Sequence, residues 1–149
     1  MGQPFLPPVE RAVEGVCTGM RVRKLARRVS QIYDEALGGS GLSIGQFGLL
    51  GHVVGGREPS VSELAERLVM DRSSLSRTLG PLVRAGLVEL GGRDGGKRVK
   101  VVRATDAGRA AFAAAEPAWL KGQTRVAEAL GAERRSRLHE VLDDTLKRL

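Results

Sequence analysis

The chain has 149 residues with a formal charge of +7, which predicts one compact domain with a basic surface suited to an anionic partner. Aromatic residues make up only 3%, so leucine, valine and alanine must fill the core. No apolar run approaches the roughly 18 residues of a membrane span, no signal peptide opens the chain and one cysteine excludes an internal disulfide, so we expect a cytoplasmic protein.

The N-terminal part of the chain is predicted to hold an extended arm followed by two helices. Residues 1–11 contain three of the six prolines, so we expect the arm there. A helix is predicted from about Val13 to Leu37, because apolar residues recur at helical spacing at Val22, Leu25, Val29, Ile32 and Ala36. Ser43 and Gln46 have the spacing of a capping box, which indicates that a second helix begins directly after Ser43.

Two short helices joined by a tight turn are predicted next. Ser60 and Glu63 form another capping box, and the helix that they open has an apolar face of Val61, Leu64, Ala65 and Leu68. Asp71 is the N-cap of the following helix, whose buried stripe is predicted to be Leu75, Leu79, Leu82 and Val83. Gly86 suits the left-handed residue that ends this helix. The pattern predicts a helix-turn-helix.

The second of these helices carries polar side chains in its first two turns. In a helix-turn-helix, this end of the second helix meets base edges in the DNA major groove. The residues predicted to contact DNA from this recognition helix are Arg72, Ser73, Ser74, Ser76 and Arg77. A helical hairpin with a solvated polar face would show the same two helices, so the segment that follows has to distinguish the two interpretations.

A basic β-hairpin is predicted behind the helices. Its strands are Leu87–Leu90 and Lys97–Arg103, and the four glycines between them permit the positive φ angles of a turn. Basic residues outnumber acidic ones eight to three between Asp71 and Arg103, as expected for a surface that binds phosphates. We expect this wing to reach the minor groove or its phosphates with Arg93, Lys97 and Arg98. The sequence therefore predicts a mainly α winged helix-turn-helix with a small β-hairpin wing.

The same glycines spell most of a phosphate-binding P-loop. Residues Gly91–Lys97 match the pattern G-x-x-x-x-G-K, but Arg98 stands where the motif needs serine or threonine to hold Mg²⁺. The motif also needs a helix next, whereas Val99–Val102 is rich in β-branched residues and predicts a strand. We interpret the glycines as turn residues and expect no cofactor.

Two more helices are predicted after the wing. Thr105 caps the first, which continues to about Ala129 with a kink or a local end at Pro117. The last runs from about Ala132 to Leu149 and has an apolar stripe at Leu138, Val141, Leu142, Leu146 and Leu149. Neither this stripe nor that of the first helix has a partner inside so small a domain. We therefore expect two chains to pair through their terminal helices.

This organisation makes residues 1–149 a single protomer of a dimer. Its DNA-binding lobe is predicted at residues 43–104, and its dimerisation helices at residues 12–38 and 107–149. A two-fold axis between the protomers would place the two recognition helices about one DNA turn, roughly 34 Å, apart.

Four short motifs occur here together, in the order and spacing of a known protein family. They are Leu42-Ser43-x-x-Gln46-Phe47, Glu63-Leu64-Ala65, Gly86-Leu87-Val88 and Thr105-x-x-Gly108. In this combination the chain resembles the MarR family of bacterial transcriptional regulators over nearly its whole length after about residue 15. The resemblance implies a homodimer that binds pseudopalindromic operators, usually as a repressor. It also implies release by small lipophilic ligands or by thiol oxidation.

Three departures from the family pattern bear on function. Gly96, rather than an acidic residue, directly precedes the basic pair of the wing. Pro81 removes a backbone hydrogen bond inside the recognition helix. Cys17 lies near the start of the first helix, like the sensor cysteine of peroxide-sensing members, but the aromatic residues that accompany that cysteine are missing. A redox-sensing regulator that uses Cys17 is therefore the second alternative.

Two other classes of function compete with a sequence-specific regulator. Charge alone would serve a non-specific or architectural nucleic-acid-binding protein, but the serines between the two arginines of the recognition helix can reach base edges. An enzyme is not expected, because His52 and His139 are the only histidines and neither lies near Cys17 in the sequence. No ligand spacing supports a zinc site.

Overall fold

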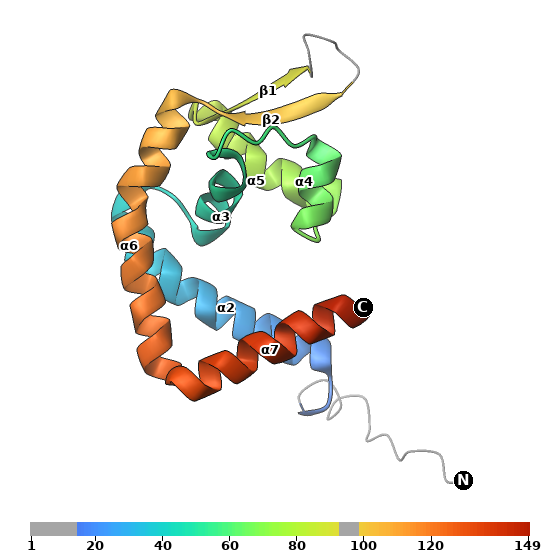
Figure 1. Ribbon diagram of the computed structural model, residues 1–149, viewed down its shortest axis with the longest axis vertical. Helices are drawn as coiled ribbons and strands as arrows, with labels where there is room; N and C mark the ends of the chain where they lie inside the picture. Colours follow the sequence, from blue (N-terminus) through green and yellow to red (C-terminus); the bar gives the residue numbers. More distant parts are fainter. Residues whose placement is uncertain (1–14, 93–98) are drawn as a thin grey trace, which may run out of the picture.

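The computed structural model describes residues 15–92 and 99–149, so the predicted arm over residues 1–11 lies outside the described residues. Figure 1 shows a helical lobe covered by a two-stranded hairpin and a long helix along one side of the lobe. One further helix continues from the far end of the long helix, and another has its end beside the middle of the long helix. None of the described helices has the length and hydropathy needed to cross a lipid bilayer. In chain order the elements are α2 (Thr18–Leu37), η1 (Gly38–Ser40), α3 (Ile44–Val53), α4 (Val61–Arg67), α5 (Arg72–Arg84), β1 (Val88–Gly92), β2 (Lys100–Ala104), α6 (Asp106–Leu130) and α7 (Ala132–Arg148).

The lobe formed by α3, α4, α5 and the hairpin encloses one hydrophobic core. Each of its elements contributes a side chain with 2% or less of its surface exposed, namely Leu50, Leu64, Leu75, Val88 and Val102. Burying an aliphatic side chain of this size contributes roughly 1.5–3 kcal/mol. The shared core therefore fixes the positions of α5 and of the hairpin relative to each other.

The four predicted N-caps are confirmed. Ser43 and Ser60 each form a complete capping box, in which the serine oxygen accepts a hydrogen bond from the third helical residue at 3.2 and 3.1 Å. Asp71 accepts from the backbone N–H of Ser74 at 2.8 Å, which starts α5. Thr105 accepts from Gly108 at 3.0 Å and starts α6. Each cap satisfies backbone donors that the first helical turn leaves unpaired.

The buried stripe of α5 is narrower than the sequence predicted. Leu75, Leu79 and Leu82 are buried, whereas Val83 is 37% exposed, so the prediction for Val83 is wrong. At about 100° per residue, Val83 lies roughly 80° around the helix from Leu75. The other two leucines lie within about 40° of Leu75, and only this narrower arc faces the core.

The first strand begins one residue later than predicted, because Leu87 takes part in the cap that follows α5. Gly86 has a φ of 69°, as expected for a left-handed residue after a helix. Its N–H donates to the carbonyl of Val83 at 3.0 Å, and the N–H of Leu87 donates to Leu82 at 2.9 Å. These two bonds form a Schellman motif, which ends α5 and turns the chain into β1 at Val88.

The hairpin uses two of its glycines as strand residues. Gly91 and Gly92 continue β1 and pair with Val101 and Lys100 of antiparallel β2. Neither has a positive φ, so the turn role predicted for these two is wrong. The other two glycines of the predicted turn lie outside the described residues.

Neither internal proline ends its helix. Pro81 lies within α5 and Pro117 within α6, and both helices continue past them. The prediction that the helix could end locally at Pro117 is therefore wrong. Figure 1 shows α6 as one continuous, bowed helix. Proline removes one backbone hydrogen bond and commonly bends a helix without breaking it.

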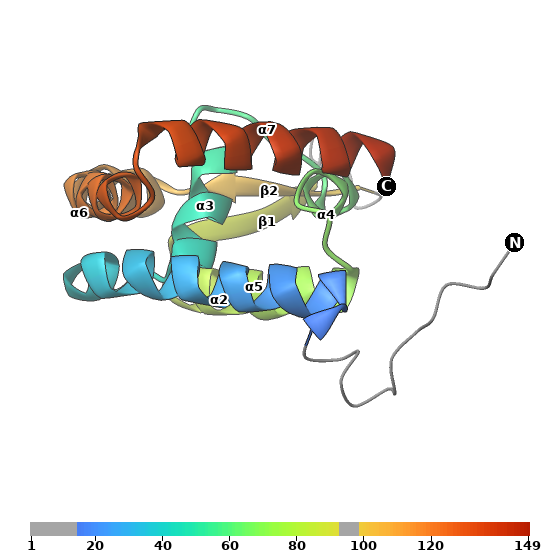
Figure 2. The same cartoon turned by 90° about the horizontal axis from the view of Figure 1, so that it is seen from below.

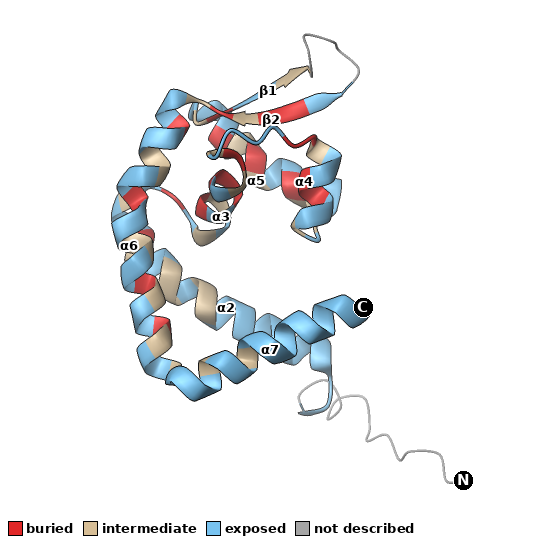
Figure 3. Cartoon of the chain, viewed as in Figure 1, coloured by how far each residue is buried: buried red, intermediate tan, exposed pale blue. Residues whose placement is uncertain are grey.

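The helices α2 and α7 both pack against α6 but expose most of their surfaces. Gly122 of α6 lies against the ring of Tyr33 of α2, whose hydroxyl donates to Gln123. A pair between Arg125 and Glu35 at 3.0 Å joins the same two helices. By contrast, α7 has no buried residue and forms the exposed rod that Figure 3 shows in pale blue. Figure 2 shows α2 and α7 separated from each other, and Figure 1 shows that both lie below the lobe.

Candidate nucleic-acid interface

The exposed face of α5 carries the polar side chains that the sequence predicted there. Arg72, Ser73, Ser76 and Arg77 are exposed, while Ser74 is half-buried. The opposite face of the same helix is buried in the core, so α5 cannot rotate to hide these groups. An exposed row of arginine and serine side chains on a fixed helix can donate to and accept from base edges.

Ser74 differs from the other serines because its hydroxyl is already engaged. It donates to Asp71 at 2.7 Å and accepts from the guanidinium of Arg77 at 3.1 Å. The side-chain hydrogen bond from Ser74 lowers the pKa of Asp71, and the backbone N–H of Ser74 lowers this pKa further. Ser74 therefore orients Arg77 in the unbound protein.

This surface also includes a residue of α4, Ser62, which was not predicted from the sequence. The guanidinium of Arg72 donates to the hydroxyl of Ser62 at 3.0 Å, although the two residues belong to different helices. Ser62 is exposed in the first turn of α4 and shows in the sequence only as a polar residue after the Ser60 cap. The contact ties the start of α4 to the start of α5.

The three basic residues predicted for the wing, Arg93, Lys97 and Arg98, lie outside the described residues. The base of the wing is described and carries two further cations. Lys100 is exposed at the start of β2. Arg103 pairs with Glu58 at 2.9 Å and donates to the carbonyl of Gly92 at 3.2 Å. The P-loop interpretation requires a helix after its glycines, and the strand Lys100–Ala104 excludes it.

The wing is anchored on both sides of β2. Besides its pairing with β1, the N–H of Val102 donates to the carbonyl of Pro59 at 2.9 Å, and Ser60 forms an isolated antiparallel bridge with Val101. Pro59 and Ser60 lead directly into α4. The wing is therefore bonded to the start of the helix-turn-helix through the main chain.

An apolar pocket of about 230 Å³ lies between α3 and α6. Its wall is a stack of rings, because the ring of Phe47 lies 4.5 Å from that of Phe112 and 5.7 Å from that of Trp119, between centroids. Gly48 lines the same pocket, and a Cβ added there would meet nothing within 4 Å. Among the described lining residues, Glu116 alone is charged. The pocket suits a small, flat, lipophilic molecule.

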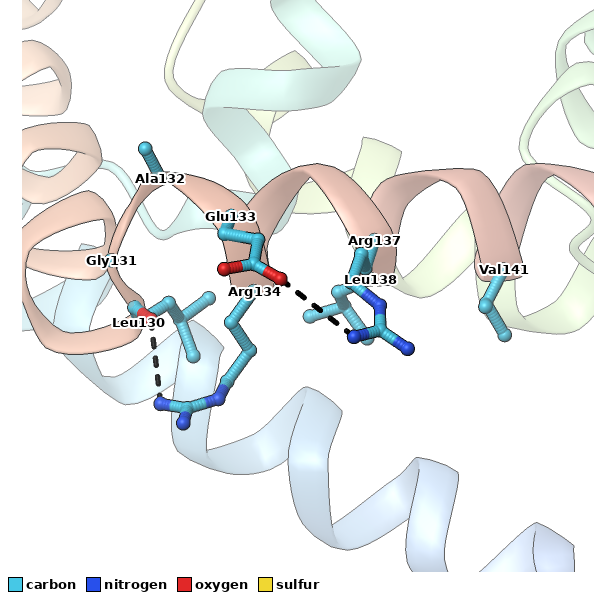
Figure 4. Close-up of a pocket in the computed structure, with 8 residues that line it drawn as sticks. All are labelled: Leu130, Gly131, Ala132, Glu133, Arg134, Arg137, Leu138 and Val141. Carbon is cyan, nitrogen blue, oxygen red and sulfur yellow. Dashed lines mark hydrogen bonds and ion pairs between the residues drawn. The ribbon is translucent and has the colours of Figure 1, made fainter.

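A second hollow lies at the corner between α6 and α7 and has a volume of about 670 Å³. Figure 4 shows its wall, which comes from the single stretch 130–141, with Leu130, Leu138 and Val141 as its larger apolar side chains. The arginines along it bond locally: Arg134 donates to the carbonyl of Leu130 at 3.4 Å, and Arg137 lies 3.8 Å from Glu133. The hollow is thus an apolar surface edged by paired charges.

Cys17 is exposed and occupies the N-cap position of α2 without a capping hydrogen bond from its side chain. No group of three or more potential metal ligands gathers within the described ranges 15–92 and 99–149. These observations do not test whether Cys17 takes part in redox sensing, which stays the second alternative.

Comparison with known proteins places this architecture in one family. The family model of the MarR family matches residues 40–98. The Mycobacterium tuberculosis transcriptional regulator MosR is 32% identical, with 91% of this chain and 98% of that chain covered and a TM-score of 0.74. A second structure, of M. tuberculosis MosR in complex with DNA, is 34% identical, with coverage of 88% and 96% and a TM-score of 0.72.

More distant structures share the same fold. A mutant of Escherichia coli MarR complexed with operator DNA is 22% identical, with 91% of this chain and 97% of that chain covered and a TM-score of 0.78. A search of curated protein sequences finds no match. The matched proteins are transcriptional regulators rather than enzymes. With its helix-turn-helix, hairpin and flanking helices all in the matched order, the chain belongs to the MarR family of DNA-binding transcriptional regulators.

Proposed function

We propose that the protein is a sequence-specific regulator that reads duplex DNA with α5 in the major groove. The observation that carries this proposal is the exposed row of Arg72, Ser73, Ser76 and Arg77 on the first two turns of α5. Arginine can bond a guanine edge through two donors, and serine can bond several bases. The structure of MosR in complex with DNA, at 34% identity, supports a DNA-binding role for this chain.

A non-specific DNA-binding protein is the alternative, because a charge of +7 attracts any duplex. A competition measurement separates the two functions. An operator duplex obtained by selection is bound at fixed salt and challenged with random duplex. We expect a preference of at least about 10³-fold for the operator. Equal competition by random duplex would favour the non-specific alternative.

We propose further that two chains pair through the terminal helices, residues 12–38 and 107–149. The apolar stripe of α2 includes Val22 and Leu25, which are 50% and 38% exposed, and that of α7 includes Val141 and Leu146, which are 62% and 64% exposed. Large apolar stripes of this kind normally face a partner. A second copy of the chain offers the same two stripes across a two-fold axis.

We propose that the regulator is a repressor released by a small lipophilic effector. The pocket between α3 and α6 supports this proposal, because α3 belongs to the DNA-binding lobe and α6 leads to the terminal helices. A molecule bound between them would favour one angle between the DNA-binding lobe and α6 over another. It would change DNA affinity only by its difference in affinity for the two arrangements.

The pocket can be tested through its own fluorophore, since Trp119 is the single tryptophan. We expect 4-nitrobenzyl alcohol to quench Trp119 saturably and to weaken operator binding. The acid analogue 4-nitrobenzoate should bind less well, because Glu116 repels a carboxylate. Gly48→Leu should fill the pocket and remove both effects while DNA binding persists.

Gly45→Leu provides the matched control for that variant. Gly45 lies on the same helix but does not line the pocket, and its added Cβ would have only the side chain of Ser43 nearby, at 3.9 Å. Both variants replace glycine by leucine in α3. If both abolished quenching alike, or if Gly48→Leu left the response to the alcohol intact, the pocket would not be the effector site.

A further inference from the structure

Arg103 joins three segments that lie apart in the chain. It projects from β2, pairs through Nε with Glu58 in the loop before α4 at 2.9 Å, and donates from Nη2 to the carbonyl of Gly92 on β1 at 3.2 Å. Its side chain is only 27% exposed. Arg103 therefore lies across the base of the wing rather than pointing away from it.

The glycine at position 91 makes room for this arginine. A Cβ added to Gly91 would collide with Nη1 of Arg103 and lie 3.5 Å from Cζ. Gly91 is a strand residue without a positive φ, so no turn geometry requires glycine there. The close approach of the guanidinium to the backbone is the remaining reason for glycine at this position.

The partner of Arg103 belongs to a segment that also contacts the recognition helix. Glu58 is followed by Pro59 and Ser60, which bond to β2, and Ser60 caps α4. Ser62 in the first turn of α4 then accepts the hydrogen bond from Arg72 of α5. One continuous set of contacts thus leads from the base of the wing to the first turn of the recognition helix.

We propose that Arg103, held by Glu58 and seated on Gly91, is a positioning residue that sets the angle between the wing and α5. It acts through the contacts of the wing and not through its own contact with DNA, because its Nε and Nη2 donors already face a carboxylate and a carbonyl. This inference rests on the proposed DNA-binding function. An ion pair at this degree of exposure adds little to folding stability. A variant without it should therefore stay folded, and its effect should be seen in DNA binding.

The test is a double-mutant cycle on the full-length chain. Arg103→Ala and Gly91→Ala are each combined with the wing pair Lys97→Ala/Arg98→Ala, and operator affinity is measured over a series of salt concentrations. Gly91→Ala displaces the guanidinium without changing the charge, at little cost in stability because only a flexible side chain must move. Arg109→Ala is the control, since it removes an equal charge from an arginine that also bonds β2, at the carbonyl of Ala104 at 3.0 Å, but that ties the strand to Asp106 of α6 rather than to the loop before α4.

We expect Arg103→Ala and Gly91→Ala each to weaken operator binding about tenfold. In either background, Lys97→Ala/Arg98→Ala should cause almost no further loss of affinity, as for residues that act as one unit. The salt slope of log K should fall by about 0.9 for each DNA phosphate that the wing no longer neutralises, although Gly91→Ala removes no cation and Arg103→Ala removes only Arg103 itself. Arg109→Ala should leave the slope and the effect of the wing pair unchanged.

Three results would overturn the inference, and the failure of the inference is distinguishable from that of the proposed function. If the wild-type chain binds the operator specifically while the affinity changes caused by Arg103→Ala and by the wing pair are additive, Arg103 does not act through the wing. An unchanged salt slope in folded Gly91→Ala would lead to the same conclusion. If the wild-type chain shows no preference for any duplex, the proposed function fails and takes this inference with it.

Discussion

Arg77 is the last residue of the exposed row on α5, and its guanidinium is held by Ser74 at 3.1 Å. We expect Arg77→Ala to remove a two-donor bond to a base, which corresponds to roughly 1–3 kcal/mol of discrimination. Base preference should flatten at one position of each half-site, as measured by competition with single-substitution operators. Equal weakening on every duplex would instead make Arg77 a phosphate contact.

Val69 is the one non-glycine residue with a positive φ among the described residues, at 51°, and it is 81% exposed. It occupies the turn after α4, where its N–H donates to Glu66 at 3.1 Å and that of Met70 donates to Ala65 at 2.8 Å. This is the same Schellman geometry that uses glycine after α5. A β-branched residue is strained in it by about 1–2 kcal/mol.

We therefore expect Val69→Gly to stabilise the protein by about 1 kcal/mol, with the higher chain entropy of unfolded glycine offsetting part of the relief. Urea unfolding at neutral pH measures the change. Val69→Ala keeps a Cβ but removes the branch, so its free energy of unfolding should lie between those of wild type and Val69→Gly. A glycine variant no more stable than wild type would show that the turn carries no strain.

At the scale of the elements, Asp71 makes the stability of α5 depend on pH. Its pKa is lowered from 3.8 in the folded protein, chiefly by the hydroxyl of Ser74. A carboxyl with a lowered folded pKa stabilises the fold fully above its ordinary pKa, and this contribution is lost as the pH falls through the lowered value. Asp71→Asn keeps a capping oxygen but removes the charge.

Wild type should accordingly be more stable than Asp71→Asn at pH 7, and the difference should shrink as the pH falls below 3.8. Urea unfolding of both proteins across this range is the measurement. Ser74→Ala, which removes the hydroxyl but keeps the backbone donor, should show a weaker pH dependence than wild type. A difference that stayed constant with pH would exclude the charge of Asp71 as its source.

The elements themselves were largely predictable, because their signals are local. Ser43, Ser60, Asp71 and Thr105 each act on a backbone N–H three residues away, and such spacings can be read directly from a sequence. The exposed row of α5 followed from helical periodicity in the same way. Val83 was wrongly predicted to be buried, because periodicity gives the direction of a helix face but not how wide an arc of it the core covers.

The contacts between elements could not be predicted. Glu58 and Arg103, or Ser62 and Arg72, meet only after the lobe has folded, and no spacing in the chain links them. The same holds for Gly91, whose role depends on a guanidinium from the opposite strand. The sequence therefore identified the recognition helix but not the contacts that tie it to the wing.

At the scale of the whole molecule, α7 has no role in the core of its own chain. It contains no buried residue, so deleting Ala132–Leu149 should leave the lobe folded. We expect this truncated protein to be monomeric, because each large aliphatic side chain of α7 would contribute roughly 1.5–3 kcal/mol on burial in a dimer. Operator affinity should fall, because a monomer can occupy only one half-site.

Sedimentation of both proteins, with circular dichroism as the control for folding, checks this expectation. Val141→Asp/Leu146→Asp places charges on the same stripe without shortening the chain and should also give monomers. A wild-type chain that sediments as a stable monomer and binds a full operator with undiminished affinity would contradict the dimer.

The central claim is that two α5 helices read DNA bases across a two-fold axis, and selection of bound sequences from a random duplex library tests it most directly. The account predicts enrichment of an inverted repeat whose half-site centres lie about 10 base pairs, or roughly 34 Å, apart. The same selection with Arg77→Ala should show no base preference at one position in each half-site. A wild-type pool that shows no enriched sequence would contradict the account.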